Sequence, residues 1–221
     1  MSATNRGAER RALDYYPTPA WCVRRVLESL DLPRGVWLEP SAGDGAIVRE
    51  VRARAARVVA FDLRPECRAD LTASGADEVH IGDALALTWP RVDVVIGNPP
   101  YALADEFARL AVGASTHVVM LLRLNWISAR SRVAWLRLHR PDVWILPERP
   151  SFDGSGNTDA TAYAWLHWHP RRGGRRQLAR HDARRRAEAG RRGATATVRG
   201  CAVSGGLRLR GGGLLLRDLA Q

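Results

Sequence analysis

Short apolar runs alternate with amphipathic segments along residues 14–170 of this 221-residue chain. Each apolar run carries hydrophobic side chains at consecutive positions, which is typical of strands that are buried on both faces. The segments between them place apolar residues on one helical side. This alternation predicts a mostly parallel sheet with helices on both faces. The predicted strands are 36–40, 57–63, 79–82, 92–97, 117–124, 142–146 and 161–168, and the predicted helices are 21–30, 46–55, 66–73, 103–112 and 130–139.

The pattern therefore predicts an α/β fold, a Rossmann-like, doubly wound sheet of seven strands that occupies residues 14–170. Such sheets bind ligands beyond the carboxyl ends of their strands, where the strand order reverses. The residues with candidate chemistry follow predicted strand ends, so we expect them to gather at one edge of the sheet. Residues 1–13 are predicted to be a flexible N-terminus.

The net charge of +11 comes from the last quarter of the chain. Residues 1–170 hold 20 arginines and 20 acidic residues, whereas residues 171–221 hold 14 arginines and 3 acidic residues, so the tail carries the excess (14 − 3 = 11). The tail has no aromatic residue and cannot bury enough apolar surface to offset the entropy of ordering. We predict that this Arg/Gly-rich tail is disordered. Three interpretations of this tail stay open: a nucleic-acid-binding arm, a solvated extension without function, and the product of a frameshift.

Several classes of protein are disfavoured by the composition. No apolar run approaches the roughly 20 residues that span a membrane, and the N-terminus lacks the apolar segment of a secretion signal. The cysteines, Cys22, Cys67 and Cys201, are widely spaced and odd in number, which argues against a disulfide framework or a zinc site. A cytoplasmic protein with no membrane partner is expected. His167 and His169 alternate on one predicted strand, and with no third ligand visible we interpret them as ordinary strand positions.

A glycine-rich turn, LEPSAGDG at residues 38–45, joins the first predicted strand to a helix. Gly43 and Gly45 permit a tight turn and close approach of a ligand to the backbone. The turn lacks the Gly-Lys-Ser/Thr of a Walker loop, and Val48 stands where a GxGxxG motif has its third glycine. Glu39 at the strand end suits a ligand with cationic and hydroxyl groups rather than a pyrophosphate.

Acidic side chains also follow the next two predicted strands. Asp62 can accept hydrogen bonds from ribose hydroxyls, and Asp83 can accept one from an adenine amino group. A single aspartate at such a place is often a helix cap or a turn residue. Together with Glu39, however, three successive strand ends carry a carboxylate. This arrangement predicts a pocket for S-adenosylmethionine.

With these motifs the chain resembles the class I S-adenosylmethionine-dependent methyltransferases, and in particular the amino-methylating DNA methyltransferases with an E-P-[SA]-x-G-x-G loop and an N-P-P-Y tetrapeptide. The resemblance spans about residues 14–169, and DYYPTP at 14–19 is similar to the segment that contacts the methionine part of the cofactor in adenine enzymes. Thr18 has an alternative role as the N-cap of the next helix, with Pro19 at its first position. The resemblance implies cofactor contacts from Tyr16, Thr18, Pro19, Glu39, Pro40, Ser41, Gly43, Gly45, Asp62, Asp83, Ala84 and Asn98.

The tetrapeptide NPPY, directly after the fourth predicted strand, is predicted to carry the methyl transfer. An exocyclic amino nitrogen is a weak nucleophile because its lone pair is delocalised into the ring, and two acceptors on its hydrogens aim that lone pair at the methyl carbon. Asn98 offers a side-chain carbonyl and Pro99 a backbone carbonyl, while Pro99 and Pro100 restrict the backbone. Tyr101 is predicted to stack on a flipped base. Phe152 is a second stacking candidate with an alternative role in the core, and no metal is required.

The predicted function is methylation of the N6 amino group of adenine in DNA, double-stranded with one base flipped. Base recognition would fall to short segments such as 126–132 and 148–159, which favours a relaxed phage-type methylase or one that needs a specificity partner. Cytosine N4 enzymes more often carry Ser or Asp at the position of Asn98. Three alternatives stay open: a ribosomal RNA adenine methyltransferase, a protein-glutamine methyltransferase, and a methyltransferase fold that binds the cofactor without turnover. The sequence predicts no oligomeric state.

Overall fold

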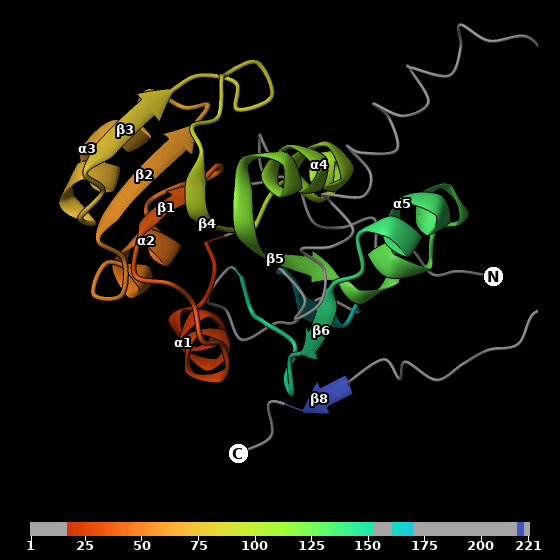
Figure 1. Cartoon of the computed structure of the whole chain (residues 1–221). Helices are drawn as coiled ribbons and strands as arrows, with labels where there is room; N and C mark the ends of the chain where they lie inside the picture. The colour runs from red at the N-terminus through yellow and green to blue at the C-terminus, as the bar shows by residue number, and fades with distance from the viewer. Residues whose placement is uncertain (1–16, 153–160, 170–215, 219–221) are drawn as a thin grey trace, which may run out of the picture. The chain divides into compact units, whose positions relative to one another are not determined.

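The computed structural model describes residues 17–152 and 161–169, together with the backbone of 216–218. These residues form one mixed sheet with the strand order β3-β2-β1-β4-β5-β7-β6-β8 (Figure 1). The strands are β1 Val36–Glu39, β2 Arg57–Asp62, β3 Glu78–Ile81, β4 Val92–Gly97, β5 Ser115–Arg123, β6 Asp142–Ile145, β7 Tyr163–Trp168 and β8 Leu216–Asp218.

The seven-stranded, mostly parallel sheet that the apolar pattern predicts is confirmed. Strands β1 to β5 run parallel to their neighbours, and β7 is antiparallel to both β5 and β6. The short strand β8, which pairs in parallel with β6, was not predicted and lies within the segment that we expected to be a disordered tail. The rest of that tail and the predicted flexible N-terminus, 1–13, lie outside the described residues.

Helices cover both faces of the sheet, with α1 and α2 on one face and α4 and α5 on the other (Figure 1). The described part of the chain contains no helix both long and apolar enough to cross a lipid bilayer. The predicted helix 130–139 is divided into a 3-10 turn and a short α-helix. The helices are α1 Ala20–Ser29, α2 Ala46–Val51, α3 Cys67–Ala73, α4 Ala104–Ala114 and α5 Val133–Leu138, with 3-10 turns η1 Tyr101–Leu103, η2 Leu124–Ser128 and η3 Arg130–Arg132.

Consecutive apolar residues in the strands supply both cores, because side chains alternate between the two faces of a sheet. In β1, Trp37 packs into the core on the α1 side and Leu38 into the core on the α4 side. In β4, Ile96 packs on the α1 side and Val95 on the α4 side. All four of these side chains are at most 1% exposed. The two cores hold the strand ends rigidly and so position the residues that follow them.

Candidate active site

The strand order reverses between β1 and β4, and the residues after these two strands lie side by side. A Cβ placed on Gly97, the last residue of β4, would lie 3.3 Å from Cδ of Pro40 and 3.8 Å from the Ser41 hydroxyl oxygen. The glycine loop after β1 and the tetrapeptide after β4 therefore meet at the point where doubly wound sheets bind their ligands.

The glycine loop uses backbone conformations that favour glycine. Gly43 has a φ of 60° and Gly45 a φ of 81°, both in the left-handed region. The Gly43 N–H donates to the Asp62 carboxylate at 2.7 Å. A Cβ on Gly45 would lie 2.4 Å from the hydroxyl oxygen of Ser74, which is too close for any side chain. The sequence prediction that both positions need glycine is thus consistent with the geometry.

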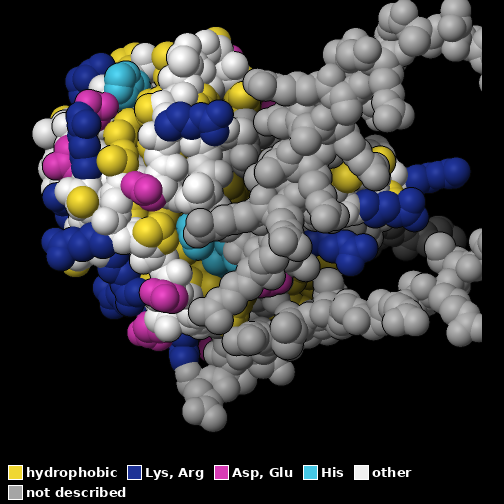
Figure 2. Space-filling view, in the orientation of Figure 1, with side chains coloured by type: hydrophobic (Ala, Val, Ile, Leu, Met, Phe, Trp, Pro, Cys, Tyr) yellow, Lys and Arg dark blue, Asp and Glu magenta, His cyan; other side chains and the backbone are white. Residues whose placement is uncertain are grey.

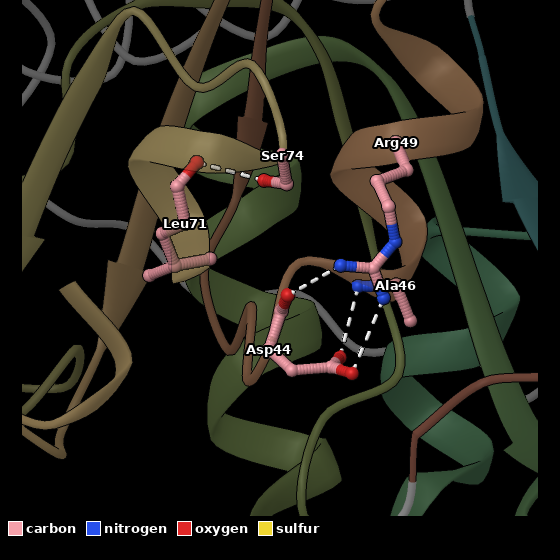
Figure 3. Close-up of polar contacts among 5 residues, drawn as sticks. All are labelled: Asp44, Ala46, Arg49, Leu71 and Ser74. Atoms are coloured by element: carbon pink, nitrogen blue, oxygen red, sulfur yellow. Dashed lines mark hydrogen bonds and ion pairs between the residues drawn. The ribbon is translucent and has the colours of Figure 1, made fainter. Parts of the chain in front are cut away.

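Two further side chains fix this loop (Figure 3). The Asp44 carboxylate accepts a hydrogen bond from the Ala46 N–H at 3.0 Å and forms an ion pair with Arg49 at 3.2 Å. The Arg49 guanidinium also donates to the Asp44 carbonyl at 2.7 Å. Directly after α3, Ser74 is held in place by donating to the Leu71 carbonyl at 2.7 Å. The loop therefore keeps its shape through its own contacts.

Glu39, at the end of β1, is the carboxylate that best fits a ligand. Its side chain is 2% exposed, and among the described residues its Oε2 atom has no hydrogen-bond partner. Burial raises the pKa of Glu39 well above its usual value, and the nearby Asp44 charge raises that pKa further. The Ser41 hydroxyl, two residues further along the chain, is also buried without a partner in the described part of the chain. Unpaired buried polar atoms are costly, so amino and hydroxyl groups of a bound S-adenosylmethionine would fit here.

Asp62 and Asp83 differ from Glu39 because their carboxylates already accept hydrogen bonds from nearby residues. Asp62 is 7% exposed and accepts from Gly43 and from Arg64, whose backbone N–H and Nε lie 2.9 and 3.0 Å from Oδ1. Asp83 is exposed and accepts from the Leu85 N–H at 2.9 Å, as a turn residue does. Contacts of either residue with a cofactor stay predictions, as does the predicted contact of buried Ala84.

The tetrapeptide is joined to the segment before α1. The half-buried Asn98 donates from Nδ2 to the Thr18 hydroxyl at 3.1 Å, and Thr18 is itself 6% exposed. The alternative role of Thr18 as a helix N-cap is wrong, because α1 begins at Ala20 and Pro19 is the preceding cap residue. Sequence reasoning missed the Asn98–Thr18 contact. Tyr16 lies outside the described residues.

The prolines continue into a turn that presents Tyr101. Pro99 is buried, and the Pro100 carbonyl accepts from the Leu103 N–H at 2.9 Å. The Tyr101 ring lies 5.6 Å from the Tyr163 ring, and the Arg123 guanidinium lies 4.8 Å from its centroid. Burial, followed by the proximity of Tyr163, raises the pKa of the Tyr101 hydroxyl.

Tyr163 connects the two predicted stacking residues. It is 2% exposed, and Phe152 packs edge-on against it at 5.2 Å. Phe152 is itself 9% exposed and belongs to the core on the α1 side, which was the alternative reading of this residue. Base stacking by Tyr101 and Phe152 stays a prediction. The largely apolar run of β7, which is buried throughout, indicates that Tyr163 is buried but not which rings it contacts.

A cluster of imidazoles lies near the start of β5, at the opposite edge of the sheet. His117 joins His167 and His169, with its Nδ1 3.1 Å from Nε2 of His167. The three rings are stacked, and His169 contacts Asp142 at 2.8 Å. The alternation of His167 and His169 along one strand does not predict His117 as a third imidazole, because His117 comes from β5. Within the described ranges, no three His, Cys, Asp or Glu side chains are arranged to hold a metal ion.

No protein-family model matches the chain. A probable ribosomal RNA small subunit methyltransferase A from Halobacterium salinarum is 33% identical over 158 residues, which cover 64% of this chain and 52% of that protein. A protein of the same name from Methanosarcina mazei is 32% identical over 87 residues, 37% of this chain and 32% of that protein. The chain thus spans about half the length of the first of these relatives.

Solved structures with the same fold include a putative RNA methyltransferase from Pyrococcus horikoshii. It has a TM-score of 0.59 and 20% identity, and the match covers 71% of this chain and 88% of that one. A dimethyladenosine transferase from Plasmodium falciparum has a TM-score of 0.56 and 14% identity, over 72% of this chain and 65% of that one. The sheet order, the glycine loop and these similarities together establish that the chain has the class I S-adenosylmethionine-dependent methyltransferase fold.

Proposed function

We propose that this chain transfers a methyl group from S-adenosylmethionine to the N6 amino group of adenine in ribosomal RNA. The observation that carries the proposal is the meeting of the NPPY tetrapeptide with the glycine loop that follows Glu39, a buried carboxylate with one oxygen that has no partner among the described residues. The names of the curated relatives support ribosomal RNA over DNA, the substrate that the sequence alone favoured.

The chain's own residues provide a place for the cofactor, which supplies the electrophilic methyl group when bound. The Glu39 carboxylate would accept from the amino group of its methionine part, and the side-chain-free backbone at Gly43 allows close approach, whereas Gly45 makes room for Ser74. A carboxylate has about four acceptor positions, and those of Asp62 are taken by Gly43 and Arg64. A ribose hydroxyl would therefore replace the Arg64 guanidinium, whose Nη2 contact with Asp62 is long at 3.4 Å.

The tetrapeptide provides the acceptors for the adenine amino group. The Asn98 amide nitrogen donates to Thr18, which orients the amide group, and its carbonyl oxygen is buried. With the Pro99 carbonyl, it would accept the two hydrogens of the adenine amino group and stabilise the charge that develops on nitrogen. Holding nitrogen, methyl carbon and sulfur in line supplies most of the rate enhancement in such a transfer.

The test uses methyl-labelled S-adenosylmethionine with separate pools of ribosomal RNA, DNA and ribosomal protein. We expect label in RNA, recovered as N6-methylated adenine after nuclease digestion. Asn98→Ala should lose transfer while its cofactor affinity, measured by calorimetry, stays near that of the wild type. Label found only in DNA or only in protein would refute the RNA assignment. Cofactor binding without transfer to any pool would instead favour the non-catalytic alternative.

A further inference from the structure

The segment that follows β5 has a one-sided charge. Residues 123–140 contain five arginines and no acidic residue, although residues 1–170 as a whole balance 20 arginines against 20 acidic residues. Arg123, the last residue of β5, lies over the Tyr101 ring of the tetrapeptide, with 4.8 Å between the guanidinium carbon and the ring centroid. This basic segment therefore begins at the candidate active site and leads away from it.

A single carboxylate on α4 holds the first part of the segment in place. Asp105 accepts from the Trp126 indole N–H at 2.7 Å and forms a short ion pair with Arg132. Arg132 also donates to the Trp126 carbonyl at 3.1 Å, and its guanidinium lies 5.0 Å from the Trp126 ring. The segment is thus a fixed part of the fold, and the charge of Arg132 is already balanced.

Two of the other arginines lie at exposed positions on η3 and α5. Arg130 and Arg137, seven residues apart and so about two helical turns, are both exposed, as are Val133 at 41% and Leu138 at 79%. Arg109 of α4 joins them, because its guanidinium lies 5.2 Å from the ring of Trp135 on α5. Figure 2 shows the dark blue and yellow side chains gathered over α5. We call this group the α5 surface: Arg109, Arg130, Val133, Arg137 and Leu138.

We propose that the α5 surface binds the phosphodiester backbone that flanks the target adenine; this assignment rests on the function proposed above. Arginine side chains without a balancing carboxylate neutralise phosphates and position a nucleic acid, and they do so without identifying its bases. The segment begins at Arg123 beside Tyr101 and continues along α5 to His139, whose carbonyl accepts from Trp168 near the start of β5. The surface therefore leads from the candidate active site toward the other end of the sheet, along a path that flanking chain could follow. Single-stranded RNA and DNA share the phosphodiester chemistry, and the names of the relatives favour RNA.

The experiment compares two double variants of the full chain. Arg130→Ala/Arg137→Ala removes two charges from the α5 surface. Arg34→Ala/Arg91→Ala removes two exposed charges from residues that precede β1 and β4, at the opposite strand ends, so both variants have the same net charge. Equilibrium binding of a labelled single-stranded RNA oligonucleotide is measured over a series of KCl concentrations. Thermal melting verifies that both variants are folded, which matters because Arg91 donates to the Gly113 carbonyl.

The logarithm of the binding constant falls linearly with the logarithm of the salt concentration, by roughly 0.7 for each phosphate contact on a single strand. We expect the α5 variant, which loses two such contacts, to have a slope that is less steep by about 1.4. The control variant should change the slope much less. An unchanged slope in the α5 variant, or an equal decrease in both variants, would overturn the proposal. A DNA oligonucleotide of the same sequence forms a second arm, and a decrease confined to DNA would assign the surface to DNA instead.

Methyl transfer is measured separately, so the two proposals can fail independently. If the wild type methylates RNA but the α5 variant binds RNA like the wild type, the surface assignment fails and the enzymatic function stands. If the slope decreases as expected but the wild type methylates no nucleic acid, the function fails and the binding surface stands.

Discussion

The imidazole cluster predicts an acid-sensitive fold. Burial, followed by the neighbouring His169 and His117, lowers the pKa of His167 to about 3. Its carboxylate neighbour Asp142 acts in the opposite direction but does not restore the usual value. The pKa of His117 is lowered as well, chiefly by burial and then by His169. His167 therefore stays neutral in the folded chain at pH values where it would bind a proton in the unfolded chain.

The sign and size of the effect follow from proton linkage. Between pH 6.5 and about pH 3 the unfolded state binds more protons at His167, so the free energy of unfolding decreases as the pH falls through this window. One pH unit corresponds to about 1.4 kcal/mol, so lowering the pH from 7 to 5 should cost about 2 kcal/mol from this residue alone. For a chain of this size that equals a decrease in Tm of about 4 to 8 °C.

Urea unfolding of the wild type, His167→Asn and His80→Asn at pH 7 and pH 5 measures this effect. His80 is exposed on β3 and serves as the matched control for the loss of an imidazole outside the cluster. The difference between the two pH values should be about 2 kcal/mol smaller in His167→Asn than in the wild type. If the free energy of unfolding decreases equally on acidification in the wild type and in His167→Asn, then His167 is not neutral and buried as described.

Two other predictions test the glycine loop and the cofactor carboxylate. Gly45→Ala should destabilise the fold by about 2 kcal/mol or more, because a Cβ there meets Ser74 at 2.4 Å in a left-handed backbone; Gly113→Ala, with no atom within 4 Å of its Cβ, should be neutral or stabilising in the same thermal melts. S-adenosylmethionine affinity should rise with pH, because a cationic ligand favours ionised Glu39 and the pKa of the free carboxyl is raised. Calorimetry at a series of pH values should show a cofactor affinity that does not change with pH for Glu39→Gln. A wild-type affinity that is equally independent of pH would contradict the role given to Glu39.

Features that depend on neighbouring residues along the chain were predictable from the sequence. The apolar runs predicted every strand from β1 to β7, because burial on both faces requires hydrophobic side chains at consecutive positions. The bounds of β4 agree at both ends, since polar or turn-forming residues follow the run directly. The glycine loop was recognisable because Gly43 and Gly45 adopt backbone conformations that other residues rarely take.

Contacts between distant residues were not predictable in the same way. Asn98 meets Thr18 across 80 positions of sequence, and the pairing depends on how α1 packs against β4. His117 reaches His167 because the antiparallel register of β5 and β7 pairs Val119 with His167, which leaves His117 two residues along on the same face. Nothing local to either strand fixes that register, because it is set by packing against the rest of the sheet.

The three carboxylates at successive strand ends show why position alone does not identify a ligand contact. A carboxylate at the end of a parallel strand lies near the ligand crevice in every case, but its hydrogen bonds decide what it can still accept. The exposed Asp83 closes a turn, and the Asp62 carboxylate already accepts hydrogen bonds from the glycine loop and from Arg64. Of these three, only Glu39 is both buried and left with an oxygen that has no partner in the described part of the chain. A fold tolerates such an atom at a cost of about 1 to 3 kcal/mol, which a bound donor would recover, so Glu39 is where binding energy from the cofactor should be concentrated.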